Sequence, residues 1–239
     1  ATLVHDDILD EADLRRGAQT INSLHGNEAA VMLGDYLLSS AFLLCSTIKN
    51  PELNILLGEV TNTLCAGELV QLSRRNDLDL DLRSYYQIIH DKTASLIAAS
   101  CEMGAILGRG SDCEIKVLKD FGGSVGVAFQ IKDDLLDLLG DREIIGKPAG
   151  RDLEKGKLTL PIITMLANDP SLKGDVKKFI NEADRDALVE MLHNTGSISS
   201  AFTDVSNMVD SAIRGVEGVF TNDSSKQLCA LAEQLKSSV

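Results

Sequence analysis

Hydrophobic residues recur every three or four positions along most of this chain, which has 239 residues and only 4 Pro. Apolar side chains at that spacing gather on one face of a helix, and alternating β-branched runs are absent, so the chain is predicted to be all-α. Gly, Asn, Ser and Pro residues separate the periodic stretches and mark where helices begin and end. In the first part of the chain, helices are expected over residues 27–48, 51–74, 84–107 (one or two helices) and 112–139.

The second part of the chain begins with a Gly-rich stretch, Gly140–Lys157, which is predicted to be an irregular loop. Loops on a rigid scaffold are where ligand contacts concentrate. A chain of this length can build one substantial core, so one domain is expected over residues 1–239. Shorter amphipathic helices are expected to close the bundle at residues 159–167, 172–180, 185–192, 198–216 and 225–235.

Charge and cysteine content narrow the classes of function. Lys and Arg number 23 against 36 Asp and Glu, and a net charge of -13 opposes binding to nucleic acid or to an anionic membrane. The 5 Cys are widely spaced and fit no zinc motif, as is typical of reduced cysteines in a cytoplasmic protein. Asp35 interrupts the best apolar run, residues 29–45, so no transmembrane segment is expected. An anionic small substrate would then need metal ions as intermediaries.

One acidic pattern occurs twice, as Asp6-Asp7-Ile8-Leu9-Asp10 and as Asp133-Asp134-Leu135-Leu136-Asp137. Residues three and four apart share a helix face, so each copy can direct its carboxylates to one place. Crowded carboxylates are costly unless a cation lies between them, and Mg²⁺ takes carboxylate, water and phosphate oxygens. A solvated helix face is the alternative interpretation, which the repetition disfavours. The candidate ligands in a magnesium site that holds a diphosphate are Asp6, Asp7, Asp10, Asp133, Asp134 and Asp137.

Basic residues near these clusters can complete an anion site. Arg binds phosphate oxygens in a bidentate way and Lys supplies a mobile point charge. The alternative is that these side chains only balance an acidic surface. The candidates are Arg15, Arg16, Lys92, Lys147 and Lys157.

Other motifs fail on inspection. Gly150 to Leu158 imitates a nucleotide-binding P-loop, but five residues separate its glycines, no Ser or Thr follows Lys157, and no strand precedes it. The four His residues show no metal-ligand spacing and are expected to be structural or solvent-facing, with His5, beside Asp6, as the candidate exception.

Several segments, taken in order, resemble the trans-isoprenyl diphosphate synthases. The resemblance implies a helical bundle around a central cavity, usually a homodimer, that condenses isopentenyl diphosphate with an allylic diphosphate. Members normally carry further helices before the first acidic motif, so we expect such helices to precede Ala1. The segments are Leu3–Gly17 with the first acidic cluster, Gly34-Asp35, Gly67–Leu72, Lys92-Thr93, Phe129–Asp137, Gly146–Gly150 and Gly156–Pro161.

The same resemblance implies a role for each site residue. Asp6 and Asp10 would bind two Mg²⁺ ions on one side of the allylic diphosphate, and Asp133 a third on the other. Arg15, Lys92 and Lys147 would contact the allylic diphosphate, Arg16 the isopentenyl diphosphate, and Lys157 the closing loop. Thr93 and Gln130 would line the reacting carbons.

Product length and two rival functions complete the expectations. In the family, the residue five before the first motif often forms the floor of the cavity. Ala1 and Thr2 are small, which predicts a long polyprenyl product whose exact length stays open. A terpene cyclase would replace one Asp-rich motif by an Asn/Ser/Glu motif, and a non-catalytic regulatory subunit would have lost one acidic cluster. Both clusters are intact, which favours an active prenyltransferase.

Overall fold

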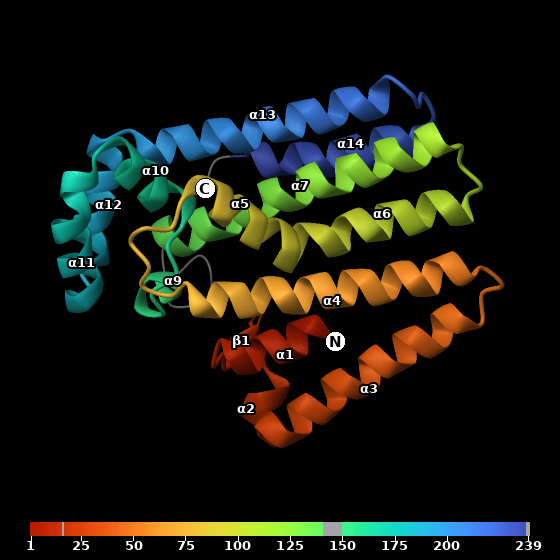
Figure 1. Cartoon of the computed structure of the whole chain (residues 1–239), viewed down its shortest axis with the longest axis horizontal. Helices are drawn as coiled ribbons and strands as arrows, with labels where there is room; N and C mark the ends of the chain where they lie inside the picture. The colour runs from red at the N-terminus through yellow and green to blue at the C-terminus, as the bar shows by residue number, and fades with distance from the viewer. Residues whose placement is uncertain (16, 141–149, 238–239) are drawn as a thin grey trace. The chain divides into compact units, whose positions relative to one another are not determined.

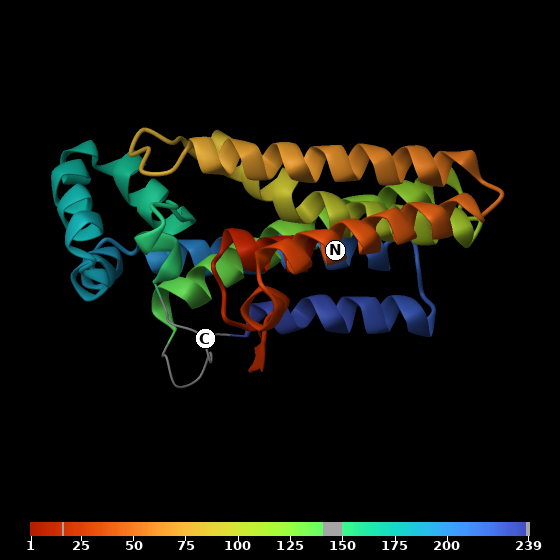
Figure 2. The same cartoon turned by 90° about the horizontal axis from the view of Figure 1, so that it is seen from below.

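Helices make up most of this chain in its computed structural model, which describes residues 1–15, 17–140 and 150–237 (Figures 1 and 2). The all-α prediction is confirmed. Contacts between residues divide the chain into two compact units. The described residues of the first unit are 1–15 and 17–58, and those of the second are 59–140 and 150–237.

The first unit is built on the long helix α3. Both α1 and α2 pack against this helix. The packing of α1 is close: a Cβ atom on Gly34 would lie 2.2 Å from His5 Nε2, so a larger residue at position 34 would displace the His5 ring. His5 donates to the Val31 carbonyl oxygen at 3.3 Å, which indicates a structural role for this histidine. The elements of the unit are α1 (Thr2–Leu9), β1 (Leu14–Arg15), β2 (Ala18–Gln19), α2 (Ile21–His25), α3 (Asn27–Ser46) and the start of α4 (Pro51–Ser73).

The second unit is centred on α7 (Asp112–Leu139), which packs along α6 (Ser95–Leu107) and along α13 (Ser197–Glu217) (Figure 1). A reciprocal pair of hydrogen bonds between Ser111 and Glu114 caps the start of α7. Arg185 donates to the carbonyl oxygens of Leu138 and Gly140 at its end. The other elements are α5 (Leu82–Ile89), η1 (His90–Ala94), α9 (Arg151–Glu154), α10 (Leu160–Asn168), η2 (Pro170–Leu172), α11 (Lys173–Glu182), α12 (Arg185–Asn194), α14 (Asp223–Glu233) and η3 (Gln234–Lys236).

Small residues let α7 approach η1 and α6 closely. A Cβ atom on Gly126 would lie 2.5 Å from the Cα atom of Ala94, and one on Gly122 would lie 2.8 Å from the Cα atom of Ala98. A larger residue at either position would push α7 away from these elements. The elements that carry the second acidic motif and Lys92 are therefore held at a fixed separation.

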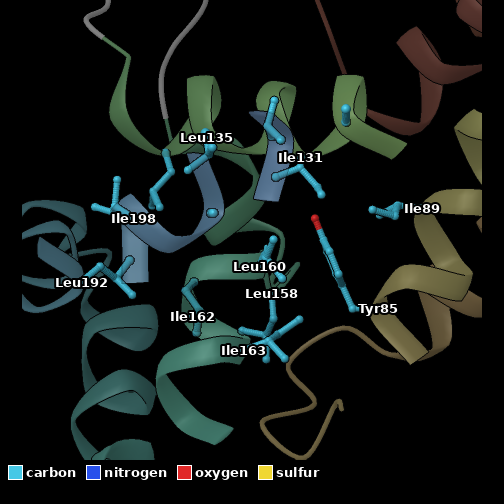
Figure 3. Close-up of a cluster of buried hydrophobic side chains, with 14 of the residues drawn as sticks. Tyr85, Ile89, Ile131, Leu135, Leu158, Leu160, Ile162, Ile163, Leu192 and Ile198 are labelled. Atoms are coloured by element: carbon cyan, nitrogen blue, oxygen red, sulfur yellow. The ribbon is translucent and has the colours of Figure 1, made fainter. Parts of the chain in front are cut away.

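The hydrophobic core of the second unit lies between α5, α7, α10, α12 and α13 (Figure 3). Ile131 and Leu135 project from α7 into this core, and both are fully buried. Tyr85 enters from α5, and Figure 3 shows its hydroxyl oxygen directed toward α7. The core thus brings one polar atom, the Tyr85 hydroxyl, to the inner face of the helix that carries the second acidic motif.

Several details of the sequence predictions were wrong. The chain forms an antiparallel hairpin, β1–β2, with two residues in each strand, and a short helix, α2. The periodicity predicted neither of them. The stretch predicted as an irregular loop contains α9. Cys65 and Cys113 are exposed, so the cysteines are not uniformly core residues. Helix α3 has the length and apolar composition to span a membrane, contrary to expectation, although a core helix or a signal sequence can pass the same test.

Candidate active site

The second acidic motif lies on the last turns of α7, and its three carboxylates have different surroundings. Asp133 is exposed, Asp137 is half-buried, and Asp134 is buried with 6% of its surface accessible. Tyr85 Oη donates to Asp134 Oδ2 at 2.7 Å, and Gln130 Nε2 donates to Asp134 Oδ1 at 2.8 Å. The middle carboxylate of this motif is thus held by protein groups.

Burial and neighbouring carboxylates disfavour ionisation of two carboxyl groups of this motif. Burial raises the pKa of Asp134 to about 7, against the favourable charge of Lys92, and the nearby Asp152 adds to the increase. Burial and then repulsion by Asp152 raise the pKa of Asp137 to about 6. Burial and the neighbouring Asp134 also raise the pKa of Tyr85. A cation bound between these carboxylates would favour their ionised forms.

The predicted cationic and polar residues Lys92 and Thr93 lie on η1, a π-helical turn between α5 and α6. Such turns are rare in helices and are frequent at functional sites. Thr93 Oγ1 donates to Gln130 Oε1 at 2.7 Å, and Lys92 Nζ donates to Gln71 Oε1 at 3.3 Å. A Cβ atom on Gly67 would lie 2.6 Å from the backbone nitrogen of Lys92, so α4 and η1 are in direct backbone contact.

The segment after Gly150 is joined to the end of the second motif. Gly150 has a φ of +82°, a conformation that favours glycine, and its N–H donates to the carbonyl oxygen of Asp137 at 2.8 Å. The N–H of Asp152 donates to Asp137 Oδ2 at 3.0 Å. Lys157 Nζ lies 3.3 Å from Asp152 Oδ1. Lys157 is therefore held close to the second acidic motif, as a contact to a bound anion would require.

The first acidic motif lies on and just beyond α1. Its middle residue, Asp7, is buried, and Arg15 Nε donates to Asp7 Oδ1 at 2.7 Å. Thr20 Oγ1 and Asn22 Nδ2 donate to the carbonyl oxygen of Ala12, which fixes the turn between α1 and the hairpin. Asp6 and Asp10 are half-buried and retain accessible surface. In both motifs the middle carboxylate faces protein donors, and the first one stays accessible.

The structure brings together some of the predicted residues. Lys92, Thr93, Gln130, Lys157 and the second motif lie around the end of α7 in one unit, whereas Arg15 and the first motif lie in the other. That the two motifs face each other across a cavity stays a prediction. Arg16 and Lys147 lie outside the described residues.

Three polar residues of this region were not predicted as site residues. They are Gln71, Tyr85 and Asp152, which bond to Lys92, Asp134 and Lys157 respectively. Asp152 lies two positions after Gly150, in the Gly-rich stretch already expected to hold ligand contacts, so its position was a usable signal. The partner of Tyr85 is 49 positions away in sequence, so only the fold reveals the contact.

The donor set of both motifs consists of carboxylate oxygens, which suits Mg²⁺. Burial, followed by the nearby carboxylate of Asp152, raises the pKa values of Asp134 and Asp137, and a cation beside them would favour their ionised forms. Among the described residues, no three His, Cys, Asp or Glu side chains already stand in a metal-binding arrangement. The oxygen-only donors of the two motifs fit an ion that takes one or two carboxylates from the protein and its other ligands from phosphate and water.

Comparison with known proteins agrees with this chemistry. The polyprenyl synthetase family matches residues 1–195. The chain is 36% identical over 235 residues to heptaprenyl diphosphate synthase component 2 of Geobacillus stearothermophilus, covering 97% of this chain and 73% of that protein. It is 40% identical over 163 residues to the octaprenyl diphosphate synthase of Escherichia coli, covering 68% of this chain and 50% of that protein. For some other curated relatives, the chain spans only about half of the relative's length, 48% in one case.

Solved structures of polyprenyl synthases have the same fold as this chain. A crystal structure of a polyprenyl synthase from Caulobacter crescentus, complexed with calcium and isoprenyl diphosphate, superposes with a TM-score of 0.91 at 32% sequence identity. The match covers 99% of this chain and 74% of that one. The chain belongs to the polyprenyl synthetase family, whose members are trans-isoprenyl diphosphate synthases.

Proposed function

We propose that this chain is the prenyl-transferring part of a Mg²⁺-dependent polyprenyl diphosphate synthase, which condenses isopentenyl diphosphate with an allylic diphosphate. The observation that carries the proposal is the cluster at the end of α7. There Lys92, Thr93, Gln130 and Lys157 gather beside an acidic motif in which burial and neighbouring carboxylates raise the pKa values of Asp134 and Asp137. The related structure described with calcium and isoprenyl diphosphate supports a divalent cation as the partner of the diphosphate.

The carboxylates of the two acidic motifs are the proposed metal ligands. Asp6, Asp10 and Asp133 are the proposed ligands of three Mg²⁺ ions, and each of these side chains retains accessible surface. Asp7, Asp134 and Asp137 also stay predicted ligands, although each one bonds to protein here. When bound, Mg²⁺ stabilises the negative charge that develops on the departing diphosphate.

The basic residues hold the diphosphates in place. Arg15, Lys92 and Lys147 are proposed to contact the allylic diphosphate, and Arg16 the isopentenyl diphosphate. Lys157, which is held near the second motif through Asp152, is proposed to approach the bound anion from the closing loop. Lys92 is anchored by Gln71, so its charge stays at one place before substrate arrives.

The polar oxygens of Thr93 and Gln130 face the carbons that react. Departure of the diphosphate leaves an allylic cation, which the double bond of isopentenyl diphosphate attacks to form the new carbon–carbon bond. The cation formed by this attack then loses a proton to the departed diphosphate, which gives the product and completes the cycle. Surroundings from which water is excluded protect the cation, and Gln130 and Thr93 contribute electronegative oxygen there.

The product is proposed to be long. Ala1 and Thr2, which lie one to two turns before Asp6, are small, and each added five-carbon unit that is buried contributes up to about 4 kcal/mol. The relatives from Geobacillus stearothermophilus and Escherichia coli are named for heptaprenyl and octaprenyl products.

The assembly is proposed to contain a second chain, most simply another copy of this one. Helix α3 exposes large apolar residues within its own unit, with Met32, Tyr36, Leu43 and Leu44 between 66% and 69% accessible. The name of one relative, component 2, favours a second candidate, a subunit that works with a different chain. The described cysteines form no disulfide, which supports a cytoplasmic location.

The experiment is to incubate the full-length protein with Mg²⁺, isopentenyl diphosphate and farnesyl diphosphate, and to separate the products by reverse-phase chromatography. The proposal predicts elongated polyprenyl products that disappear when a chelator removes Mg²⁺. Products formed only after a different chain is added would support the two-component candidate. No incorporation under either condition would contradict the proposed function.

A further inference from the structure

Three hydrogen bonds link three helical elements through side chains alone. Thr93 Oγ1 on η1 donates to Gln130 Oε1 at 2.7 Å, and Gln130 Nε2 on α7 donates to Asp134 Oδ1 at 2.8 Å. Tyr85 Oη on α5 donates to Asp134 Oδ2 at 2.7 Å. Gln130 and Asp134 are 8% and 6% accessible and Tyr85 is 3% accessible, so water competes little for these bonds.

This chain of bonds fixes which end of the Gln130 amide faces which neighbour. Both oxygens of Asp134 accept hydrogen bonds here, Oδ2 from Tyr85 and Oδ1 from Gln130, so the donor end of the amide, Nε2, turns toward Asp134. The acceptor end, Oε1, then faces Thr93. The orientation depends on Asp134, and Asp134 is held in turn because the Tyr85 hydroxyl occupies its second oxygen.

The ring of Tyr85 is fixed independently of its hydroxyl. It lies in the hydrophobic core near Ile131 and Ile89, and its oxygen points out of that core toward α7 (Figure 3). The neighbouring ring of Tyr86 packs edge-on at a centroid distance of 5.7 Å. A buried hydroxyl on a rigid ring is suited to hold a carboxylate in one orientation.

We propose that Tyr85 and Asp134 are positioning residues that keep the carbonyl oxygen of Gln130 directed at the reacting carbons. This inference rests on the proposed function, in which an allylic cation forms beside Gln130 and Thr93. If the amide turned over, its NH₂ group would face the cation with a partial positive charge. This role replaces the metal-ligand role predicted for Asp134 from the sequence, because Asp134 acts through Gln130, and metal binding at the second motif then falls to Asp133 and Asp137.

Kinetics of the full-length protein separate positioning from metal binding. Tyr85→Phe keeps the ring and should lower kcat about 10-fold, and Asp134→Asn, of nearly equal volume, should lower it about 100-fold. Both variants should keep the wild-type KM for the allylic diphosphate and the wild-type half-saturating Mg²⁺ concentration. Asp133→Asn should raise that Mg²⁺ concentration, and Tyr86→Phe is the matched control that should leave kcat unchanged.

A second readout does not depend on turnover. The side-chain amide of Gln130 gives a ¹H–¹⁵N resonance, identified by its loss in Gln130→Met. Tyr85→Phe should shift this resonance and speed its exchange with solvent, and Tyr86→Phe should not. This measurement keeps the test open if Asp134→Asn does not fold.

Two results would overturn the positioning role. One is an increase in the Mg²⁺ requirement of Asp134→Asn equal to that of Asp133→Asn, which would make Asp134 a ligand. The other is a Gln130 resonance that Tyr85→Phe leaves unchanged. If the wild-type protein did not condense the two diphosphates, the proposed function would fail, and the Gln130 resonance would still decide whether Tyr85 orients the amide.

Discussion

The guanidinium of Arg15 lies 2.7 Å from the carboxylate of Asp7, the middle residue of the first acidic motif. The Asp7 side chain is 9% accessible and that of Arg15 is 27% accessible, so the pair is largely removed from water. The corresponding residue of the second motif, Asp134, is buried against Tyr85 and Gln130. Each motif thus has a buried middle carboxylate that joins it to the surrounding fold.

Removing Arg15 should destabilise the protein. Arg15→Leu leaves the buried Asp7 carboxylate without its counter-charge, which should cost about 2 kcal/mol of unfolding free energy. Urea denaturation followed by circular dichroism measures the loss. Arg83→Leu, an exposed change, serves as the control. Equal stabilities of the two variants would show that the Asp7–Arg15 pair does not support the fold.

Gly67 should be needed to place Lys92. The methyl group of Gly67→Ala would meet the backbone nitrogen of Lys92 at 2.6 Å, so η1 must shift. We expect a stability loss of about 2 kcal/mol, as for overpacked cores, and a clear fall in kcat. Gly58→Ala on the same helix meets nothing within 4 Å and should instead stabilise by up to about 1 kcal/mol. Thermal denaturation and turnover of the two variants check this, and a harmless Gly67→Ala would refute it.

Asp152 should matter for metal binding even though it lies outside both motifs. Its carboxylate forms an ion pair with Lys157 and adds negative charge beside Asp137, which would attract a cation. Asp152→Asn should therefore raise the half-saturating Mg²⁺ concentration about 10-fold. Glu154→Gln, on the exposed side of the same short helix, should leave it unchanged. The Mg²⁺ dependence of turnover gives the answer, and identical curves for both variants would argue against a role for Asp152.

The size of residue 1 should set how long the product can grow, because this residue is proposed to form the floor of the cavity. Ala1→Phe in the full-length protein would place a large ring one to two turns before Asp6, and the growing chain should meet it earlier. Reverse-phase chromatography should then show shorter products at an unchanged rate of the first condensation. A product of wild-type length would mean that the cavity floor is formed elsewhere.

Most helices of this chain could be predicted from the sequence because their signals are local. Apolar periodicity and a Ser111 cap predicted α7, and Pro51 marked the start of α4. The β1–β2 hairpin was missed because two residues per strand are too few to show alternation. The π-helical turn at Lys92 was missed because it depends on contact with Gly67, which lies on another helix.

The candidate site was predictable where its residues stand in repeated motifs. The two acidic clusters form such a repeat, whereas the roles of Lys92 and Gln130 were inferred from the family resemblance. Lys92, Gln130 and the second cluster lie close together in the second unit, and their roles stay predictions. Tyr85 and Asp152 could not be distinguished from ordinary core and surface residues, because their roles come from partners supplied by folding. For the same reason, the sequence could not show that the middle carboxylates are buried.

The most direct test of the account is calorimetric titration of farnesyl diphosphate into the full-length protein, with and without Mg²⁺. The account predicts binding that requires Mg²⁺ in the wild-type protein and is weakened at least about 100-fold when Asp6→Asn and Asp133→Asn are combined. Circular dichroism of the double variant confirms that it is folded. Equal affinity of the wild-type protein and the double variant in Mg²⁺ would contradict the claim that the two acidic motifs hold the diphosphate through divalent cations.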